Sequence, residues 1–136
     1  MSSYNIFITG GASGIGYGIA EFLGAQGHTI LVADINADAA AEACQKLADK
    51  DIKALPVEID VTNAEQVGAL PAKLKDTPVD ILVNNAGIQH VSKIEDFPPE
   101  KWQMLINIML VGPALLTQAF MPGMRERDFG RSINIG

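Results

Sequence analysis

The chain has 136 residues, of which 48% are hydrophobic and 19% are charged. This composition supports one hydrophobic core and excludes both a disordered chain and several independent domains. The formal net charge of −6, without a cluster of Lys or Arg, disfavours nucleic acids and anionic membranes as partners.

Signals of export and membrane insertion are not found. The single cysteine, Cys44, rules out an internal disulfide and fits a reducing compartment, where we expect it to act as a core residue rather than a nucleophile. Residues 1–5 lack the basic and apolar regions of a signal peptide, and the longest apolar run, 104–111, is too short to span a bilayer. We expect a soluble cytoplasmic protein with one domain, residues 1–136.

Short apolar runs alternate with helix-forming segments along the whole chain. They predict strands at residues 4–9, 28–34, 52–59, 79–83 and 131–135. Pro56 cannot donate to a ladder, so it places the third strand at a sheet edge. Strands that alternate with helices form a parallel α/β sheet with right-handed crossovers, and ligands bind at the carboxyl ends of its strands.

The segments between the strands carry signals for the ends and breaks of helices. Asn36 is placed to cap the second helix. Thr62-Asn63-Ala64-Glu65 is a capping-box pattern that opens the third helix, and Pro71 should kink or split it.

The last helical stretch begins at Pro98-Pro99-Glu100 and is apolar on more than one face. Such a helix must be buried on two sides, by the sheet and by a partner helix in this chain or in another. Gly112-Pro113 should bend it. We therefore expect a homo-oligomer that associates through residues 100–124.

The glycine-rich segment 9–16, Thr9-Gly10-Gly11-Ala12-Ser13-Gly14-Ile15-Gly16, joins the first strand to the first helix. Unpaired N–H groups at such a helix start bind anions such as a pyrophosphate, and glycines allow a tight turn and close backbone approach. A glycine-rich turn alone is a weak signal of function.

Asp34 ends the second strand, 18 residues after Gly16. A carboxylate at that position can accept both ribose hydroxyls of an adenosine and would repel a 2′-phosphate. Neither Ile35, which follows Asp34, nor Ser13, which precedes Gly14, carries a positive charge that could bind such a phosphate. This pattern predicts NAD rather than NADP. The alternative is an aspartate that only caps a helix or lies on the surface.

Five features together resemble the short-chain dehydrogenase/reductase family over the whole chain. They are Thr9-Gly10-x-x-x-Gly14-x-Gly16, Asp34, Asp60-Val61, Asn84-Asn85-Ala86-Gly87 and Asn107. The glycine spacing is that of this family and differs from Gly-x-Gly-x-x-Gly. The resemblance implies a doubly wound, Rossmann-like sheet of about seven strands, of which this chain would hold five in the order 3-2-1-4-5 and would lack the carboxyl end. It also implies NAD- or NADP-dependent hydride transfer with a small carbonyl or alcohol.

The resemblance carries cofactor roles over by position. The residues it assigns to the cofactor are Thr9, Gly10, Ser13, Gly14, Ile15, Gly16, Asp34, Asp60, Val61, Asn85, Ala86 and Gly87. Among these, Ile15 would offer its N–H near the pyrophosphate, and Asp60 would accept from the adenine amino group beside the Val61 backbone. Without the resemblance, Asp60 is equally an acid at the start of a helix, and 84–87 is a turn formed by asparagines and glycine.

A narrower resemblance, to bacterial D-3-hydroxybutyrate dehydrogenases, covers residues 79–90 and continues through 120–125 and 129–135. It implies that Gln89 binds the carboxylate of an acetoacetate-like acid through its amide N–H, which orients the acid without adding charge. His90 is a second, ambiguous substrate residue. The alternative for Gln89 is a surface loop residue. Neither histidine has a partner at ligand spacing, so we expect no metal site.

Asn107 is the polar residue of the most apolar helix. The resemblance implies a catalytic asparagine whose backbone holds a water in a proton relay. The alternatives are a contact with its own helix backbone or a polar residue that specifies a helix bundle.

The remaining catalytic residues of the family are a serine just after the fifth strand and a Tyr-x-x-x-Lys pair further on. The chain ends at Gly136 before them, and Tyr4 and Tyr17 lie in the wrong place. We expect the amino-terminal part of an NAD-dependent dehydrogenase for small hydroxy and keto acids, inactive as this chain alone. The alternatives are a non-catalytic nucleotide-binding or oligomerisation module, and a dehydrogenase for another small alcohol or carbonyl.

Overall fold

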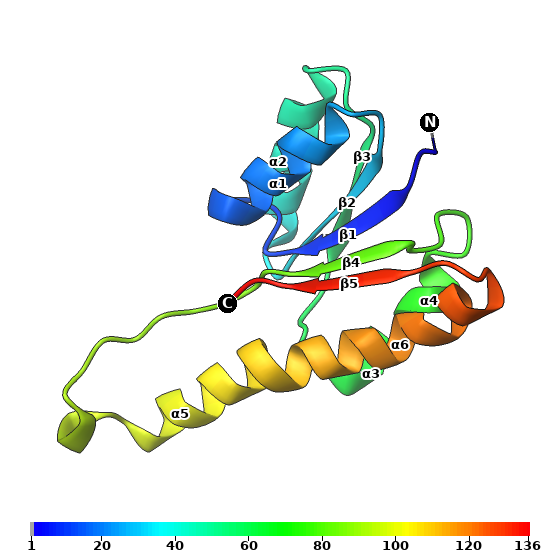
Figure 1. The fold of residues 1–136 in the computed structure, drawn as a ribbon. Helices are drawn as coiled ribbons and strands as arrows, with labels where there is room; N and C mark the ends of the chain where they lie inside the picture. The colour runs from blue at the N-terminus through cyan, green and yellow to red at the C-terminus, as the bar shows by residue number, and fades with distance from the viewer. Residues whose placement is uncertain (1) are drawn as a thin grey trace.

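A computed structural model describes residues 2–136 (Figure 1). Its elements, in chain order, are β1 (Asn5–Thr9), α1 (Gly14–Gly24), β2 (Thr29–Asp34), α2 (Ala37–Ala48), β3 (Ala54–Glu58), α3 (Ala64–Gly68), α4 (Leu70–Lys73), β4 (Ile81–Asn84), the 3₁₀ turn η1 (Ile94–Asp96), α5 (Pro99–Ile106), the π-helical segment η2 (Asn107–Val111), α6 (Gly112–Glu126) and β5 (Arg131–Asn134). Helices α1 and α2 lie on one face of the sheet, and α6 lies on the other with α3 and α4 packed beside it.

The five strands are all parallel and run in the order β3-β2-β1-β4-β5, as predicted. Phe7 at the centre of β1 is level with Leu31 of β2 and Leu82 of β4. Pro56 pairs with Val32 in the edge strand β3, which confirms that the proline marks an edge. The order places the ends of β2 and β3 on one side of β1 and the end of β4 on the other.

Two cores form because successive side chains of a strand point to opposite faces of the sheet. Ile6 and Ile8 pack under α1 and α2, whereas Phe7 packs with Leu116 and Phe120 of α6 on the opposite face. The rings of Phe7 and Phe120 lie 5.0 Å apart between centroids at an interplanar angle of 59°. This packing holds α6 against the middle of the sheet.

Helix caps confirm one prediction and correct another. The side chain of Asn36 accepts the N–H of Ala39 at 3.0 Å, as expected of a cap. The third helix is capped by Asn63, whose side chain accepts the N–H of Gln66 at 3.0 Å, and not by Thr62. Thr62 lies one residue before this cap, and its hydroxyl donates to the carboxylate of Asp60 at 2.6 Å.

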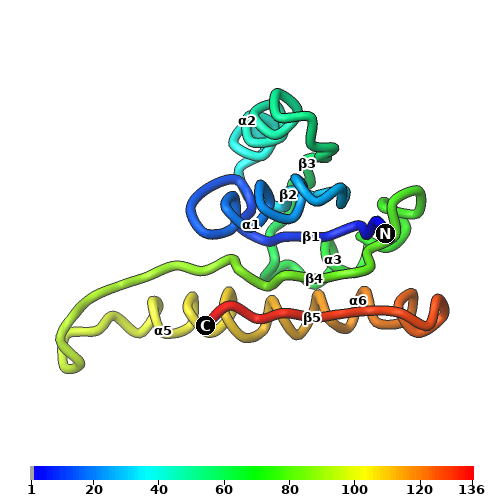
Figure 2. The backbone as a smooth tube through the Cα atoms, turned by 45° about the horizontal axis from the view of Figure 1, so that its top comes forward, coloured from blue at the N-terminus to red at the C-terminus, as the bar shows by residue number. Residues whose placement is uncertain are grey.

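Pro71 splits the third helical stretch, as predicted, because it lies in the first turn of a separate helix, α4. The last stretch, in which a bend at Gly112-Pro113 is predicted, continues through these residues as one helix of 28 residues, Pro99–Glu126. The disturbance appears as the π-helical segment just before Gly112. Figures 1 and 2 show the resulting rod, which reaches past the carboxyl edge of the sheet.

Burial differs between the two halves of this rod. In α6, Gly112, Leu116 and Phe120 are buried against the sheet, whereas no residue of α5 is buried and Trp102 is 47% exposed. The predicted second covering is therefore not provided by residues 2–136. The rod is long and apolar enough, with a mean hydropathy of 1.7, to cross a membrane by length and composition, but α6 packs as a core helix of the sheet.

Candidate functional site

A cavity of about 310 Å³ opens at the carboxyl ends of the strands. Its lining comes from the ends of four strands and from the long helix: Thr9, Gly10, Ser13, Ala33, Asp34, Ile35, Ile59, Asp60, Val61, Asn85, Ala86, Gly87, Ile88 and Ile108. All the cofactor residues predicted from the sequence line it except the three that open α1, Gly14, Ile15 and Gly16. The structure brings these residues together at the carboxyl edge of the sheet, where ligands of such sheets are expected to bind.

The segment between β1 and α1 is shaped for close backbone approach. Gly10 and Gly14 have positive φ angles of 62° and 55°, which favour glycine. A methyl group on Gly16 would collide with the carbonyl oxygen of Gly10 and lie 2.6 Å from Nδ2 of Asn85. Ser13 stands at the N-cap but makes no capping bond, so its hydroxyl and the first N–H groups of α1 remain available to an anion.

Thr9 joins the glycine-rich segment to the segment that follows β4. Its buried hydroxyl accepts the N–H groups of Asn85 and Ala86, each at 2.9 Å. The amide of Asn85 in turn donates to the carbonyl oxygens of Thr9 at 3.1 Å and Gly10 at 3.4 Å. These bonds fix the two segments relative to each other, so the parts of the cavity wall that follow β1 and β4 are held in place.

Asp34 faces the cavity from the end of β2. Its Oδ1 accepts the N–H of Asn36 at 3.1 Å, so the carboxylate has a structural role and still offers its second oxygen. Ile35 beside it is 69% exposed. The cavity lining contains two carboxylates, Asp34 and Asp60, and no Lys, Arg or His among residues 2–136. A ribose with free hydroxyl groups fits beside these two carboxylates better than a phosphate does.

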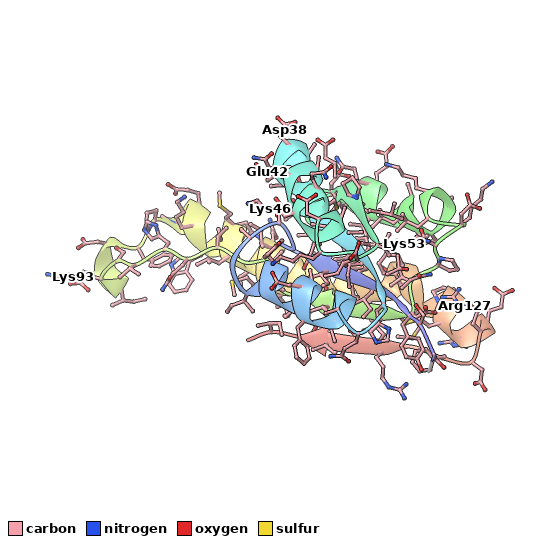
Figure 3. The ribbon with its side chains drawn as sticks, turned by 90° about the horizontal axis from the view of Figure 1, so that it is seen from above. Asp38, Glu42, Lys46, Lys53, Lys93 and Arg127 are labelled. Carbon is pink, nitrogen blue, oxygen red and sulfur yellow. The ribbon has the colours of Figure 1, made fainter. Side chains whose placement is uncertain are left out.

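Figure 3 shows where cationic side chains lie instead. Lys46 is on α2, whereas Lys93 and Arg127 are near opposite ends of the rod. Arg127 donates to the carbonyl oxygen of Val79 at 2.8 Å and lies 3.9 Å from the carboxylate of Asp80, so it stabilises the amino edge of the sheet.

Asp60 is oriented by its neighbours. Its Oδ1 accepts the N–H of Thr62 at 3.0 Å and the Thr62 hydroxyl, while its own N–H donates to Gln66 at 3.1 Å. Val61 next to it is buried beneath Gly112 of the long helix, where a methyl group would lie 2.9 Å from Cγ2 of Val61. The long helix therefore approaches the cavity closely at this point.

Asn84 lies just outside the cavity and links two strand ends. Its amide donates to Oδ1 of Asn134 at 2.9 Å, across the pairing of β4 with β5. Its own Oδ1 is buried and has no hydrogen-bond partner within residues 2–136. The side chain of Asn84 thus links two strands of the sheet, whereas the side chain of Asn85 stabilises the cavity wall.

The two predicted substrate residues follow the cavity wall but do not line it. Gln89 is exposed, and the ring of His90 packs edge-on against Phe97 with centroids 5.0 Å apart. Figure 2 shows the chain running outward from β4 to η1 before it returns as α5. In residues 2–136 no group of His, Cys, Asp or Glu could hold a metal ion.

Asn107 does not line the cavity. Its Oδ1 accepts from Nε2 of Gln103 at 2.9 Å, and its main-chain oxygen accepts the N–H of Gly112. Ile108 lines the cavity in its place, and Met109 lies next to Gly87. Helical periodicity assigns a face to such residues only when the helix is regular, and the π-helical turn changes which side chains face the sheet.

Cys44 lies in the core under α2, outside the cavity, as predicted. Burial raises the pKa of its thiol to about 11, because the thiolate would lose its hydration there. A thiol with this pKa is protonated at neutral pH and is a weak nucleophile.

Comparison with known proteins agrees with this geometry. The sequence model of the short chain dehydrogenase family matches residues 4–136. The chain is 42% identical to D-beta-hydroxybutyrate dehydrogenase of Cupriavidus necator, over 99% of this chain and 53% of that protein. The chain spans about half the length of the curated relatives that it matches.

Two solved structures have the same fold. A 3-oxoacyl-[acyl-carrier protein] reductase from Brucella melitensis with bound NAD is 30% identical, with a TM-score of 0.89 over 96% of this chain and 52% of that one. L-sorbose reductase from Gluconobacter frateurii, complexed with NADPH and L-sorbose, is 34% identical, with a TM-score of 0.90 over 98% and 52%. Proteins that share this fold thus include one with NAD and one with NADPH.

Proposed function

The chain belongs to the short-chain dehydrogenase family, and from this we propose that it forms the NAD-binding part of an oxidoreductase for small hydroxy and keto acids. The observation that carries the cofactor assignment is Asp34, which lines the cavity with no cation beside it in the described lining. Bound NAD would supply the hydride acceptor, and the residues of this chain bind and orient it.

Each part of the cavity fits one part of the dinucleotide. The free N–H groups at the start of α1 and the hydroxyl of Ser13 suit the pyrophosphate, and the collision that a methyl at Gly16 would meet shows how little room the turn leaves. Asp34 would accept from the adenosine ribose and Asp60 from the adenine amino group. Asn85–Gly87 would then hold the second ribose on the far side of β1.

The preference for NAD over NADP would arise from electrostatic repulsion of the 2′-phosphate of NADP. A 2′-phosphate would stand against Asp34 and near Asp60 without a compensating guanidinium or ammonium group. We expect NAD to bind at least about tenfold more tightly than NADP, a difference of about 1.4 kcal/mol. Titration of the chain with both nucleotides tests this, and Asp34→Ala should narrow the difference. Equal affinities for the two nucleotides in the unaltered chain would refute the assignment of Asp34.

The substrate class rests on Gln89 and His90 and on the similarity to a D-beta-hydroxybutyrate dehydrogenase. Gln89 is exposed just past Gly87, where a neutral amide could orient a carboxylate next to a nicotinamide. Acetoacetate should therefore tighten NADH binding to the chain, and Gln89→Ala should abolish that effect. No effect of acetoacetate, together with an effect of sorbose, would favour the second candidate, a reductase for other small carbonyl compounds. The similarity to L-sorbose reductase supports that candidate.

The assignment of Asn107 as a catalytic asparagine stays a prediction of the family resemblance. Its backbone would hold the water, and its main-chain oxygen accepts the N–H of Gly112. The two tyrosines lie elsewhere: Tyr4 stacks on Phe129 with centroids 4.6 Å apart, and Tyr17 does not line the cavity. No phenol of the described residues could donate a proton there. The alternative of a binding module without turnover predicts NAD binding and no NADH oxidation by this chain.

We also propose self-association through residues 100–124 and a cytoplasmic location. The support for association is the apolar surface of the rod, where Trp102, Ile106 and Leu110 are exposed. Burying such a surface against a second copy would give the second covering that residues 2–136 do not provide.

A further inference from the structure

Met109 lies where the long helix passes the end of β4. A methyl group placed on Gly87 would sit 3.6 Å from Cε and 3.9 Å from Cγ of Met109, so the thioether is within van der Waals reach of that glycine. The preceding residue, Ile108, lines the cavity together with Gly87 and Ile88. The helix therefore lines the cavity with Ile108, and Met109 lies beside Gly87 at its border.

The approach of the helix is fixed one turn further on. Any side chain at Gly112 would meet Val61, whose Cγ2 and Cβ would lie 2.9 and 3.2 Å from the added methyl group. Because Val61 is buried and lines the same cavity, this close contact sets the height of the helix above the sheet edge. The absence of a side chain at Gly112 is what allows Met109 to come up to Gly87.

The main chain at Met109 is not held by a regular helical ladder. The N–H of Gly112 donates to Asn107, five residues back, and Pro113 has no N–H to donate. In a regular α-helix these two nitrogens would serve the carbonyls of Ile108 and Met109. Both carbonyls therefore lack their α-helical donors, and the side chain of Met109, 48% exposed, can shift toward a ligand.

The strand order indicates which part of a bound dinucleotide Met109 would contact. Asp34 and Asp60 stand at the ends of β2 and β3 on one side of β1, and Gly87 follows β4 on the other side. A dinucleotide whose adenosine lies at Asp34 must place its second half at Gly87. We propose that Met109 is a specificity-determining residue, whose thioether forms the apolar wall for the nicotinamide half of the bound dinucleotide. This inference rests on the proposed function. The contact with Met109 would favour the binding of NAD over that of a mononucleotide, which lacks the nicotinamide half.

Binding of NAD and of AMP to the 136-residue chain separates this role from a structural one, because AMP occupies only the adenosine end. Met109→Ala should weaken NAD binding about two- to tenfold, the range expected for a lost sulfur–aromatic contact, and leave AMP binding unchanged. Met104→Ala, which removes a methionine of similar exposure that is not among the nearest neighbours of Gly87, should change neither affinity.

The other outcomes are equally informative. Unchanged NAD affinity in Met109→Ala, or an equal loss for NAD and AMP, would overturn the assignment of Met109 while leaving the binding site in place. If the unaltered chain bound neither nucleotide, the proposed function itself would fail and this inference with it.

Oxidation by peroxide gives a second readout that needs no substitution. Bound NAD should slow the conversion of Met109 to its sulfoxide, whereas AMP should not, and Met104 should oxidise at the same rate in both cases. Peptide mass spectrometry measures the two rates in one sample. Equal oxidation of Met109 with NAD and with AMP would contradict a contact with the nicotinamide half.

Discussion

The hydroxyl of Thr9 accepts the main-chain N–H of Asn85 at 2.9 Å across a sequence separation of 76 residues. The same oxygen accepts the N–H of Ala86 and lies 3.4 Å from the carbonyl oxygen of Val83. One buried side chain thus holds the glycine-rich segment against the segment after β4. The two halves of the cavity depend on it, because they belong to neighbouring strands whose ends would otherwise be joined only through the sheet.

Thr9→Val should test this connection, because it keeps the shape of the side chain and removes the acceptor. Two N–H groups would lose their partner at a position that is 2% exposed. We expect the free energy of unfolding to fall by about 2 kcal/mol, measured by urea denaturation. Thr9→Ser keeps the hydroxyl and should lose clearly less. An equal loss in the two variants would mean that methyl packing, and not hydrogen bonding, is what Thr9 contributes.

Two glycines of α1, Gly16 and Gly18, provide a test and a control for the tight packing of the glycine-rich turn. Gly16→Ala should destabilise the chain by about 1–3 kcal/mol and abolish NAD binding, because the methyl group would collide with Gly10 and Asn85. Gly18→Ala meets no atom within 4 Å and should stabilise α1 by about 0.5–1 kcal/mol. Thermal unfolding and NAD titration measure both effects. Normal NAD binding by Gly16→Ala would show that the turn is more open than the structure indicates.

Alkaline pH should destabilise the fold through Cys44. Its pKa is about 11 in the folded chain and 9.0 in the unfolded one, so the folded state retains a proton that the unfolded state loses. The contribution is fully present below pH 9 and disappears as the pH rises toward 11, by up to about 2 kcal/mol. Cys44→Ala should show a smaller decrease in unfolding free energy between pH 9 and 11. Parallel pH profiles for the two proteins would contradict this account of the thiol.

The exposed face of α5 predicts association between copies of the chain. Ile106→Glu would put a charge on that face without replacing a buried residue, since no residue of α5 is buried. Sedimentation velocity should show an oligomer for the unaltered chain and a shift toward monomer for the variant. A monomer at all concentrations of the unaltered chain would refute the proposal of self-association.

Much of the fold could be predicted because its signals are local. Short apolar runs between helix signals predict the five strands. Pro56 indicates the edge strand because a residue without an N–H cannot donate to a neighbouring strand. The cap at Asn36 is likewise a contact over three residues. Nine of the residues that line the cavity are named from the family resemblance, and the meeting of parallel strand ends at one edge explains why they lie together. The apolar lining residues Ala33, Ile35, Ile59, Ile88 and Ile108 are not predicted.

Two features could not be predicted in this way. The cap of the third helix is one residue later than the capping-box pattern indicates, because the helix begins at Ala64 and Asn63 caps it, while Thr62 donates to Asp60. The orientation of the long helix depends on the contact of Gly112 with Val61 and on a π-helical turn. A regular helical period could therefore not show that Ile108 would line the cavity and that Met109 would lie beside Gly87.

The central claim, that the cavity at the carboxyl edge binds NAD, is tested most directly by amide NMR spectra of the chain with and without NAD. We predict saturable shifts at Gly10, Asp34 and Gly87, with little change at Phe129 and Arg131, which border a second cavity near β5. The same shifts at Gly10 and Asp34, but not at Gly87, should appear with AMP. An unchanged spectrum, or shifts centred on Phe129 and Arg131, would contradict the claim.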